Sequence, residues 1–378
     1  MSGLYIHIPF CKQACSYCDF YFVTRQQHKQ DFVDQLIDEI RFQALAGFSG
    51  EPVRTIYFGG GTPSLLSVQQ VESILNAIYI AFNLDLQEVT FEMNPDDVSQ
   101  EYLQGLKSAG INRASMGVQT FDAGLLEFMN RAHTSDEALR CLQILQESAI
   151  DIFTVDLIYG NPGQSLAILE HDIKTLLKFD PPHISAYSLT IEPQTRVGKQ
   201  VKLGRLLPPE DDIVSDHFDL VEKLLSGVGI NQYEVSNFAK PGREARHNSN
   251  YWQHENYLGL GPGAHSFWWD ESGKSAQRWS NEKSLKNYLA GGWKEPVDKE
   301  TLNLASLAEE RLMLSLRTKL GISEEELESR YEFNFSESQK NYLKKKEGEG
   351  KLVQDEKIHL TKSGLKIADS ILLDLLTA

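Results

Sequence analysis

Three of the four cysteines in this chain lie between positions 11 and 18. Cys11, Cys15 and Cys18 have the spacing C-x3-C-x2-C and directly follow a short β-rich run. Thiolates are the protein ligands of iron–sulfur clusters, and three on one short loop can hold a four-iron cube while one iron stays open. A structural zinc site usually takes four ligands from paired cysteine elements, and no second pair follows here. The spacing favours a cluster, with zinc or free thiols as alternatives, and Cys141 is expected to be packed in a helix.

A run of glycines follows the second predicted strand. Its sequence is Gly59-Gly60-Gly61-Thr62-Pro63. Residues without a side chain let a ligand approach the backbone closely, and the N–H groups at the start of the next helix suit a carboxylate. No Gly-Lys-Ser/Thr follows, so the run is not a phosphate-binding loop of the Walker type. We expect a ligand-binding turn, with an ordinary tight turn as the alternative.

Polar side chains end three further predicted strands. Glu92 ends the third strand, Gln119 the fourth and Asp156 the fifth. In parallel barrels and open parallel sheets, active sites form at the carboxyl ends of the strands. Each of these residues alone is more often structural than functional. Their shared placement with the cysteine loop and the glycine run indicates one common site at a single rim.

The first half of the chain alternates short β-rich runs with amphipathic runs. The predicted strands are Leu4–Ile8, Arg54–Phe58, Glu88–Glu92, Arg113–Val118, Ile152–Ile158 and His183–Leu189. The predicted helices are Phe32–Leu45, Gln69–Phe82, Tyr102–Ala109, Glu137–Ser148 and Leu166–Leu177, two of them with capping-box signals at Ser67 with Gln70 and Thr134 with Glu137. The alternation predicts an α/β protein with a parallel sheet. Periodicity leaves open whether the sheet is doubly wound or a full or partial barrel.

The pattern changes in the second half of the chain. Residues 240–268 are rich in Gly, Asn, His and aromatic residues and are predicted as an irregular functional loop. The last predicted elements are the helices Asp211–Leu225 and Leu304–Lys319, a helix capped by Ser323, a hairpin of Lys351–Val353 with Ile358–Leu360, and the helix Ser363–Leu376. Helices followed by a hairpin predict a small winged-helix-like domain. We therefore expect domains at residues 1–298 and 299–378.

The composition excludes several classes of protein. The chain has 378 residues, 41% of them hydrophobic, and 37 basic against 53 acidic side chains give a net charge of −16. This is an ordinary globular composition, and the negative charge argues against nucleic acid as a partner. No signal peptide or membrane span is visible, and four cysteines exclude a disulfide scaffold. We expect a cytoplasmic monomer or homodimer.

The cysteine loop with Tyr17 and the glycine run resemble the radical S-adenosylmethionine (SAM) superfamily. Four further segments resemble its oxygen-independent coproporphyrinogen III oxidase family: Tyr5–Cys11, Gly117–Phe121, Asn130–Arg131 and Asp156–Gly160. The resemblance implies a partial (β/α)6 TIM-like barrel in which Cys11, Cys15 and Cys18 hold a [4Fe–4S] cluster. It also implies that SAM binds the open iron, where one electron can cleave its sulfonium.

The resemblance further implies which residues contact SAM. These are Tyr5, Tyr17, Gly60, Gly61, Thr62, Glu92, Gln119, Arg131 and Asp156. The residue types suit the ligand, because Arg131 can pair with a carboxylate, while Glu92 and Asp156 can accept hydrogen bonds from an amino group or ribose hydroxyls.

Two features separate this chain from the decarboxylating oxidases. Phe20 stands at the position of the last cysteine in the C-x3-C-x2-C-x-C pattern of the family that the chain resembles. An H-N-x-x-Y-W motif at residues 247–252 is similar to one found in a sister branch of heme chaperones. The motif implies heme contacts by His247, Asn248, Tyr251 and Trp252. A neutral imidazole can ligate heme iron, and the alternative is a loop in which the polar side chains bond the backbone and Trp252 packs in a core. The axial ligand stays open, with His7 and His265 as further candidates.

Three functions follow as hypotheses. The first is a heme chaperone that binds a [4Fe–4S] cluster, SAM and heme and delivers heme to acceptor hemoproteins, membrane-associated ones included. The alternative is a radical SAM enzyme of porphyrin biosynthesis that decarboxylates coproporphyrinogen III, which Phe20 disfavours. The third is a zinc-stabilised adaptor. Whether the chain is an enzyme is left open at this point.

Overall fold

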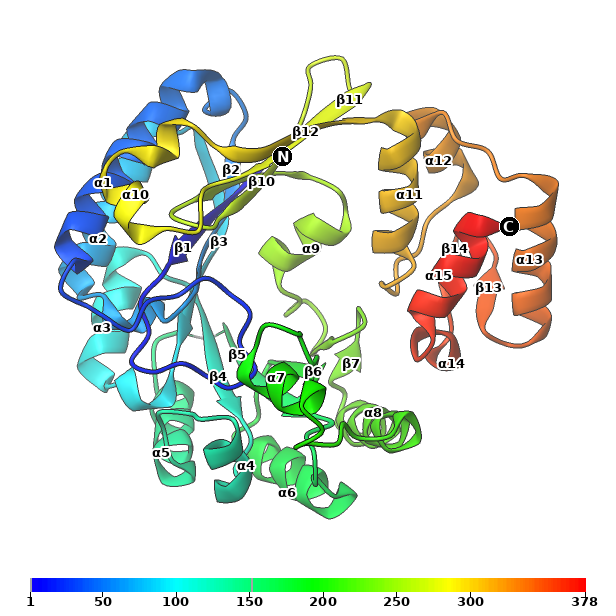
Figure 1. Ribbon diagram of the computed structural model, residues 1–378, viewed down its shortest axis with the longest axis horizontal. Helices are drawn as coiled ribbons and strands as arrows, with labels where there is room; N and C mark the ends of the chain where they lie inside the picture. The colour runs from blue at the N-terminus through cyan, green and yellow to red at the C-terminus, as the bar shows by residue number, and fades with distance from the viewer. Residues whose placement is uncertain (1, 151) are drawn as a thin grey trace.

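A twelve-stranded sheet forms the centre of the molecule. The computed structural model describes residues 2–150 and 152–378. The six central strands are parallel and follow one another in chain order: β1 (Ser2–Ile8), β2 (Val53–Gly60), β3 (Leu84–Met93), β4 (Arg113–Gln119), β5 (Ile152–Tyr159) and β6 (His183–Ser188). They curve as an open arc in Figure 1. The predicted partial (β/α)6 barrel is therefore confirmed, and every predicted strand overlaps an observed one.

Helices cover the outer face of this arc (Figure 1). They are α1 (Lys29–Gln43), the π-helical turn η1 (Ala44–Phe48), α2 (Val68–Ala81), α3 (Gln100–Ala109), α5 (Ser135–Gln146), α6 (Leu166–Leu177) and α8 (Asp211–Ser226). Their apolar faces are buried against the strands, as with Leu36 and Ile40 of α1 and Ile74 and Ile78 of α2. All six predicted helices of this layer are present, because residues at intervals of three and four carry a clear signal.

Helix caps fix where these helices begin and end. Both predicted capping boxes form, with the Ser67 hydroxyl accepting from the N–H of Gln70 and the Thr134 hydroxyl accepting from the N–H of Glu137. Gly110 ends α3 in the left-handed conformation with φ 113°. The caps therefore set the ends of the loops between strands and helices.

Four short elements between β2 and α8 were not predicted. They are η2 (Pro63–Leu65), η3 (Pro95–Asp97), α4 (Ala123–Phe128) and α7 (Arg196–Lys202). Each is too short to show a helical period in the sequence. Helix α4 begins at Asp122, whose side chain accepts from the N–H of Leu125 at 2.9 Å. This short helix matters for function, because the turn that follows it contacts the cysteine loop.

The prediction of an irregular loop over residues 240–268 is wrong. The segment contains α9 (Arg246–Trp252), β9 (Asn256–Leu260) and β10 (His265–Trp269). Strand β9 pairs with β1 in parallel and extends the sheet, with Leu258 and Leu260 fully buried. The glycine and asparagine content suggested a loop, but burial against the core determines the structure of this segment.

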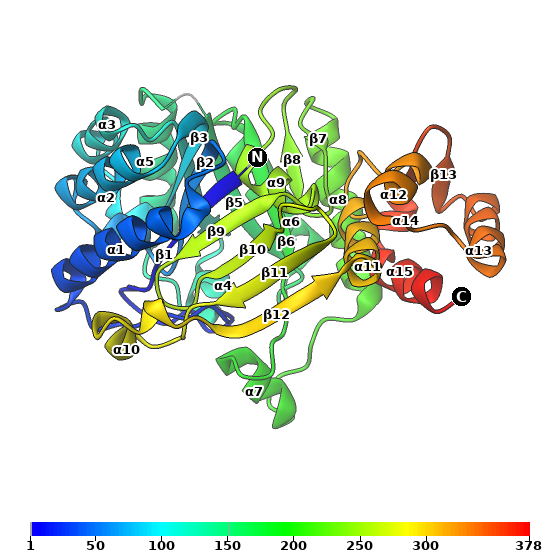
Figure 2. The same cartoon turned by 90° about the horizontal axis from the view of Figure 1, so that it is seen from above.

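Further strands extend the sheet at both edges (Figure 2). On one edge β10 is followed by β11 (Ser275–Ser280) and β12 (Val297–Asn303), all antiparallel, and on the other lie β8 (Asn237–Ala239) and β7 (Asn231–Gln232). Between β11 and β12 the chain forms α10 (Leu285–Leu289) and η4 (Gly292–Lys294).

The last part of the chain forms a small helical unit with its own hydrophobic cluster. Its elements are α11 (Leu304–Ser315), α12 (Glu324–Tyr331), α13 (Glu337–Gly348), β13 (Leu352–Gln354), β14 (Ile358–Leu360), α14 (Lys362–Leu365) and α15 (Ala368–Thr377). The hairpin is confirmed, but the single helix predicted over residues 363–376 is two helices, because the backbone at Ile367 leaves the helical conformation. The division at residues 298 and 299 stays a proposal, and β12 spans it.

Candidate functional site

The cysteine loop follows β1 and is tied to the turn after α4. The N–H of Ser16 donates to the carbonyl oxygen of Met129 at 2.9 Å. The side chain of Asn130 donates to the carbonyl oxygen of Ala14 at 2.7 Å. Both bonds link residues more than a hundred positions apart. They hold the loop in a fixed shape, as a cluster-binding loop requires.

The three thiols of this loop are all half-buried. Loss of solvent raises the pKa of Cys11 to about 11 and that of Cys18 to about 12, and the charge of Cys15 raises both further. A cationic iron cluster would favour the thiolate forms, so this donor set fits such a group. Across residues 2–150 and 152–378, no three His, Cys, Asp or Glu side chains converge as a ready-made site for a single metal ion.

Arg131 connects the cysteine loop to the ends of β3 and β4. Its Nη1 lies 3.4 Å from the Cys15 Sγ, and its Nη2 donates to Asn94 Oδ1 at 2.6 Å and to the carbonyl oxygen of Gly117 at 2.8 Å. Its Nε is buried without a hydrogen-bond partner. An unsatisfied buried donor is costly, so this atom fits an anionic ligand such as a carboxylate.

Gly117 was not predicted as a site residue, although it lies in a segment that carried the resemblance. A Cβ atom there would lie 2.9 Å from Gln119 Nε2 and 3.2 Å from Arg131 Nη2. The absence of a side chain therefore lets both polar groups lie against β4. Gln119 itself is buried and has a positive φ of 71°, which turns the chain at the end of the strand.

Glu92 lies at the end of β3 beside the glycine run. Its carboxylate accepts from the Tyr57 hydroxyl at 2.6 Å and from the N–H of Gly60 at 3.2 Å. Loss of solvent, and then the charge of Asp156, raise the pKa of Glu92 to about 7. Gly60 has a φ of 101°, and a Cβ there would lie 2.5 Å from the ring of His7, so only glycine fits.

The remaining predicted SAM residues lie around the same rim. Loss of solvent raises the pKa of Asp156 to about 6, against hydrogen bonds from Ser185 and Ser115 that lower it. The hydroxyl of Thr62 donates to Cys11 Sγ at 3.6 Å, and the hydroxyl of Tyr17 lies 3.4 Å from Arg131. Tyr5 lies near the charge of Glu92, and the N–H of Gly61 donates to the carbonyl oxygen of Ile8 at 2.8 Å. The structure thus brings the cysteines and all nine predicted SAM residues together.

Helix α9 carries the H-N-x-x-Y-W motif and lies inside the arc, packed on β1, β2, β3 and β9 (Figure 1). His247 is 1% exposed. Its Nδ1 is 2.9 Å from Thr55 Oγ1 and its Nε2 is 2.7 Å from the Tyr251 hydroxyl. Its ring stacks on Tyr57 at 5.1 Å, and burial lowers its pKa to about 3. Both ring nitrogens are occupied, so His247 cannot ligate iron in this conformation.

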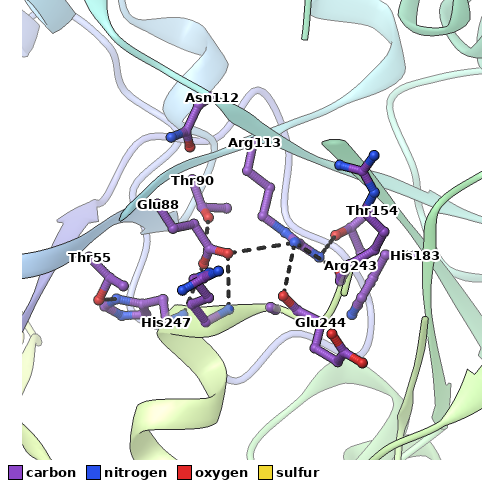
Figure 3. Close-up of polar contacts among 12 residues, drawn as sticks. Thr55, Glu88, Thr90, Asn112, Arg113, Thr154, His183, Arg243, Glu244 and His247 are labelled. Atoms are coloured by element: carbon purple, nitrogen blue, oxygen red, sulfur yellow. Dashed lines mark hydrogen bonds and ion pairs between the residues drawn. The ribbon is translucent and has the colours of Figure 1, made fainter. Parts of the chain in front are cut away.

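A buried ion pair holds the start of α9 (Figure 3). Glu88 accepts from the N–H groups of Arg246 and His247, both at 2.9 Å. Arg113 is 2% exposed, lies 3.5 Å from Glu88 and donates to the carbonyl oxygen of Arg243 at 3.2 Å. Sequence reasoning did not single out this pair. The only signal in the sequence was that each is the first, charged residue of a predicted strand.

The other candidate heme residues differ in accessibility. Asn248, Tyr251 and Trp252 are half-buried, and the carbonyl oxygen of Trp252 accepts from Arg311 at 2.6 Å. His7 is buried, with its ring nitrogens 2.8 Å from the carbonyl oxygen of Tyr21 and 3.2 Å from the Tyr5 hydroxyl. His265 is exposed on β10.

A cavity of about 360 Å³ lies between α9, the strands β9 to β11, and α11. Its lining includes Tyr251, Tyr257, Phe267, Arg278, Glu310 and Met313. The volume falls within the range of small-molecule sites, and aromatic walls with a few charged groups are typical of such sites. Tyr251 is the H-N-x-x-Y-W residue that reaches this cavity.

The chain is similar to known proteins over most of its length. The radical SAM superfamily model matches residues 5–176, and the HemN C-terminal domain model matches residues 302–367. The heme chaperone HemW of Lactococcus lactis is 35% identical over 98% of this chain and 96% of its own length. The heme chaperone HemW of Escherichia coli K12 is 38% identical over 70% of this chain and 69% of its own length.

A solved structure supports the fold assignment. The coproporphyrinogen III oxidase HemN of Escherichia coli, described as a radical SAM enzyme, superposes with a TM-score of 0.82. The match covers 99% of this chain and 89% of that one, at 24% sequence identity. The two chains therefore share one fold from end to end.

Proposed function

Because the chain belongs to the HemW family of the radical SAM superfamily, we propose that it is a heme chaperone. In this proposal it holds a [4Fe–4S] cluster and SAM, binds heme and transfers the heme to acceptor hemoproteins. A cytoplasmic location is part of the proposal, since a reducing compartment keeps the three loop thiols available as ligands. The net charge of −16 supports a partner other than nucleic acid.

The cofactor part of this proposal rests on one observation, which is that Arg131 lies against the cysteine loop. Cys11, Cys15 and Cys18 would hold the cluster. The unpaired Nε of Arg131 would meet the carboxylate of SAM, and Glu92 would accept from its amino group. When bound, the cluster and SAM supply one-electron chemistry at the sulfonium. The chain's own residues bind and orient the cofactor.

The heme part rests on the HemW relatives and the H-N-x-x-Y-W segment. That segment would contribute His247, Asn248, Tyr251 and Trp252 to the heme region. Their roles differ, because His247 is buried with both nitrogens bonded while the other three are half-buried. His247 therefore supports the site from within, and contact with heme falls to its neighbours.

Radical SAM decarboxylation of coproporphyrinogen III is the second candidate. The likeness to HemN favours it only at the level of the fold. Phe20 argues against it, because this position is an exposed phenylalanine in place of a further cysteine.

One preparation separates the two functions. Anaerobically reconstituted chain is titrated with heme and, separately, supplied with coproporphyrinogen III, SAM and a reductant. The proposal expects one heme per chain with a shifted Soret band and no decarboxylated porphyrinogen. No spectral change at stoichiometric heme would reject it, and formation of decarboxylated product would favour the enzyme.

A further inference from the structure

One residue on the buried face of α6 is a carboxylate. Asp172 is 1% exposed and shares this face with Leu169 and Ile173. Loss of solvent raises its pKa to about 6, against hydrogen bonds from the Thr120 hydroxyl and the backbone N–H of Phe121 that lower it. Burying a carboxylate costs stability, and an apolar residue would avoid that cost. The hydrogen bonds of Asp172 therefore indicate what the residue does.

Both carboxylate oxygens of Asp172 accept hydrogen bonds from the turn that follows β4. Oδ2 accepts from the Thr120 hydroxyl at 2.7 Å, and Oδ1 accepts from the N–H of Phe121 at 2.8 Å. The hydroxyl oxygen of Thr120 in turn accepts from the N–H of Asp122 at 3.1 Å. Thr120 is fully buried, so water cannot supply these bonds in place of the carboxylate. One side chain thus fixes three consecutive residues of the turn.

The turn needs this support because the residue before it is strained. Gln119 has a φ of 71°, in the left-handed region that residues with a side chain rarely adopt. Such a conformation persists only where the surrounding structure holds it. The bonds from Asp172 fix the two residues that follow, Thr120 and Phe121, so the chain stays turned after β4. The Gln119 side chain is thereby kept at the rim of the barrel, beside Gly117.

The same turn begins the segment that reaches the cysteine loop. Asp122 is the N-terminal cap of α4. At the other end of α4, the N–H of Arg131 donates to the carbonyl oxygen of Leu126 at 3.0 Å. The carbonyl oxygen of Met129 accepts from the N–H of Ser16 in the cysteine loop at 2.9 Å. Because α4 is a single short helix, a shift of the turn at its start would also displace Arg131 at its end.

We propose that Asp172 is a positioning residue for SAM, which it holds in place through Gln119 and Arg131 without touching the ligand. The role rests on the proposed function, in which Gln119 and Arg131 contact SAM. Asp172 belongs to the helix layer on the outer face of the sheet, so it acts on SAM only through the turn and α4 (Figure 1). Loss of a hydrogen bond that orients a ligand-binding group typically weakens affinity about tenfold or more.

The experiment measures SAM affinity of the full cluster-loaded chain by equilibrium dialysis, and urea unfolding of the same preparations. In Asp172→Asn the side chain keeps its shape, but its amide nitrogen cannot accept, so one of the two bonds is lost. We expect SAM affinity about tenfold weaker in this variant. Thr120→Val removes the hydroxyl that bonds the carboxylate and should weaken SAM binding in the same way. Thr120→Ser keeps the hydroxyl and should bind SAM like the wild type.

Leu169→Ala is the matched control for stability, because Leu169 lies on the same buried face of α6 as Asp172. Its truncation leaves a cavity, so it should lower the urea midpoint at least as much as Asp172→Asn does. Its SAM affinity should stay at the wild-type value, because the turn after β4 keeps its bonds. The two variants thus separate positioning of the ligand from support of the fold.

The outcomes separate this role from the proposed function. If the wild type holds no cluster or binds no SAM, the cofactor part of the proposed function fails and the role of Asp172 falls with it. If the wild type binds SAM and Asp172→Asn binds it equally tightly, only the role is overturned. A loss of SAM affinity in Leu169→Ala as large as in Asp172→Asn would also overturn it. If Asp172→Asn fails to fold, equal SAM affinity of Thr120→Val and Thr120→Ser decides against the role.

Discussion

At the scale of single residues, the site holds ionisable groups that are buried from solvent and that a bound ligand can supply with hydrogen-bond partners. Glu92 keeps a raised pKa beside two donors, and Arg131 keeps an unpaired Nε beside the thiols. Such groups cost stability unless a partner arrives, and they are typical of binding sites. The site therefore has an electrostatic preference for a ligand with both an amino and a carboxylate group.

SAM affinity should depend on pH through Glu92. Its pKa is raised to about 7, so most of this carboxyl group is protonated at pH 6 and ionised at pH 8. Only the ionised form accepts strongly from the SAM amino group, so we expect affinity about tenfold weaker at pH 6 than at pH 8. Equilibrium dialysis at both values measures this. Glu92→Gln should bind weakly at both, and a wild type with equal affinity at both would contradict the role.

The cysteines should differ sharply when replaced. Cys15→Ser should remove the cluster, because a hydroxyl is a poor iron ligand in place of a thiolate. Cys141→Ala is the matched control, since that thiol is buried in the hydrophobic core under α5 and donates to the Met116 sulfur at 3.5 Å. Iron and sulfide analysis after anaerobic reconstitution checks both. Full iron content in Cys15→Ser would disprove the assignment.

At the scale of elements, α9 is fixed by contacts with strands distant in the sequence. Glu88 of β3 and Arg113 of β4 bond the backbone at its start, and Thr55 of β2 bonds the His247 ring. A short helix has little stability of its own, so these contacts determine its position. The H-N-x-x-Y-W segment therefore depends on the barrel for its shape.

Arg113→Met should loosen this helix. The Glu88 carboxylate would be left buried without its cation, which costs about 3–5 kcal/mol of unfolding free energy. Urea unfolding measures the loss, and faster trypsin cleavage after the exposed Arg243 reports on the segment itself. Arg41→Met on the exposed face of α1 should change stability by less than about 1 kcal/mol. Equal stability of the two variants would show that the pair does not anchor α9.

Periodic elements could be predicted from the sequence, and packed irregular ones could not. The barrel strands and the layer of helices carry local patterns of hydrophobicity and capping. In contrast, residues 240–268 look like a loop until β9 pairs with β1, and nothing local reveals that pairing. The break at Ile367 within the last predicted helix likewise depends on contacts made in the folded unit.

The residues of the functional site also fall into those with a local signal in the sequence and those without one. The cysteine spacing and the glycine run are local, so sequence reasoning found them. Gly117, Tyr57 and the Glu88–Arg113 pair act through contacts that only the register of the sheet creates. The bond between His247 and Thr55 joins residues 192 positions apart, and it changes the expected role of the histidine.

At the scale of the whole molecule, the C-terminal unit is joined to α9 and to the barrel. Arg311 of α11 is buried and donates to the carbonyl oxygen of Trp252 at 2.6 Å and to Glu326 at 2.7 Å. Lys366 donates to Asp219 of α8 at 2.5 Å on the surface. No helix among the described residues is long and apolar enough to cross a membrane.

Arg311→Met should weaken the attachment of the C-terminal unit. The Trp252 carbonyl and the Glu326 carboxylate would lose their donor, at a cost of about 2–3 kcal/mol. Thermal and urea unfolding measure the effect, with Lys357→Met as an exposed control expected within about 0.5 kcal/mol of the wild type. A variant as stable as its control would mean that α11 is held by apolar contacts alone.

A heme chaperone delivers heme to an acceptor and does not merely bind it, so transfer tests the proposed function most directly. The direct measurement mixes cluster-loaded, heme-loaded chain with an apo-hemoprotein and follows the acceptor's own absorption spectrum. A parallel reaction with a passive heme scavenger gives the rate of free dissociation. We predict stoichiometric transfer at a rate that rises with acceptor concentration and exceeds release to the scavenger. A transfer rate equal to passive release at every acceptor concentration would contradict the proposed function.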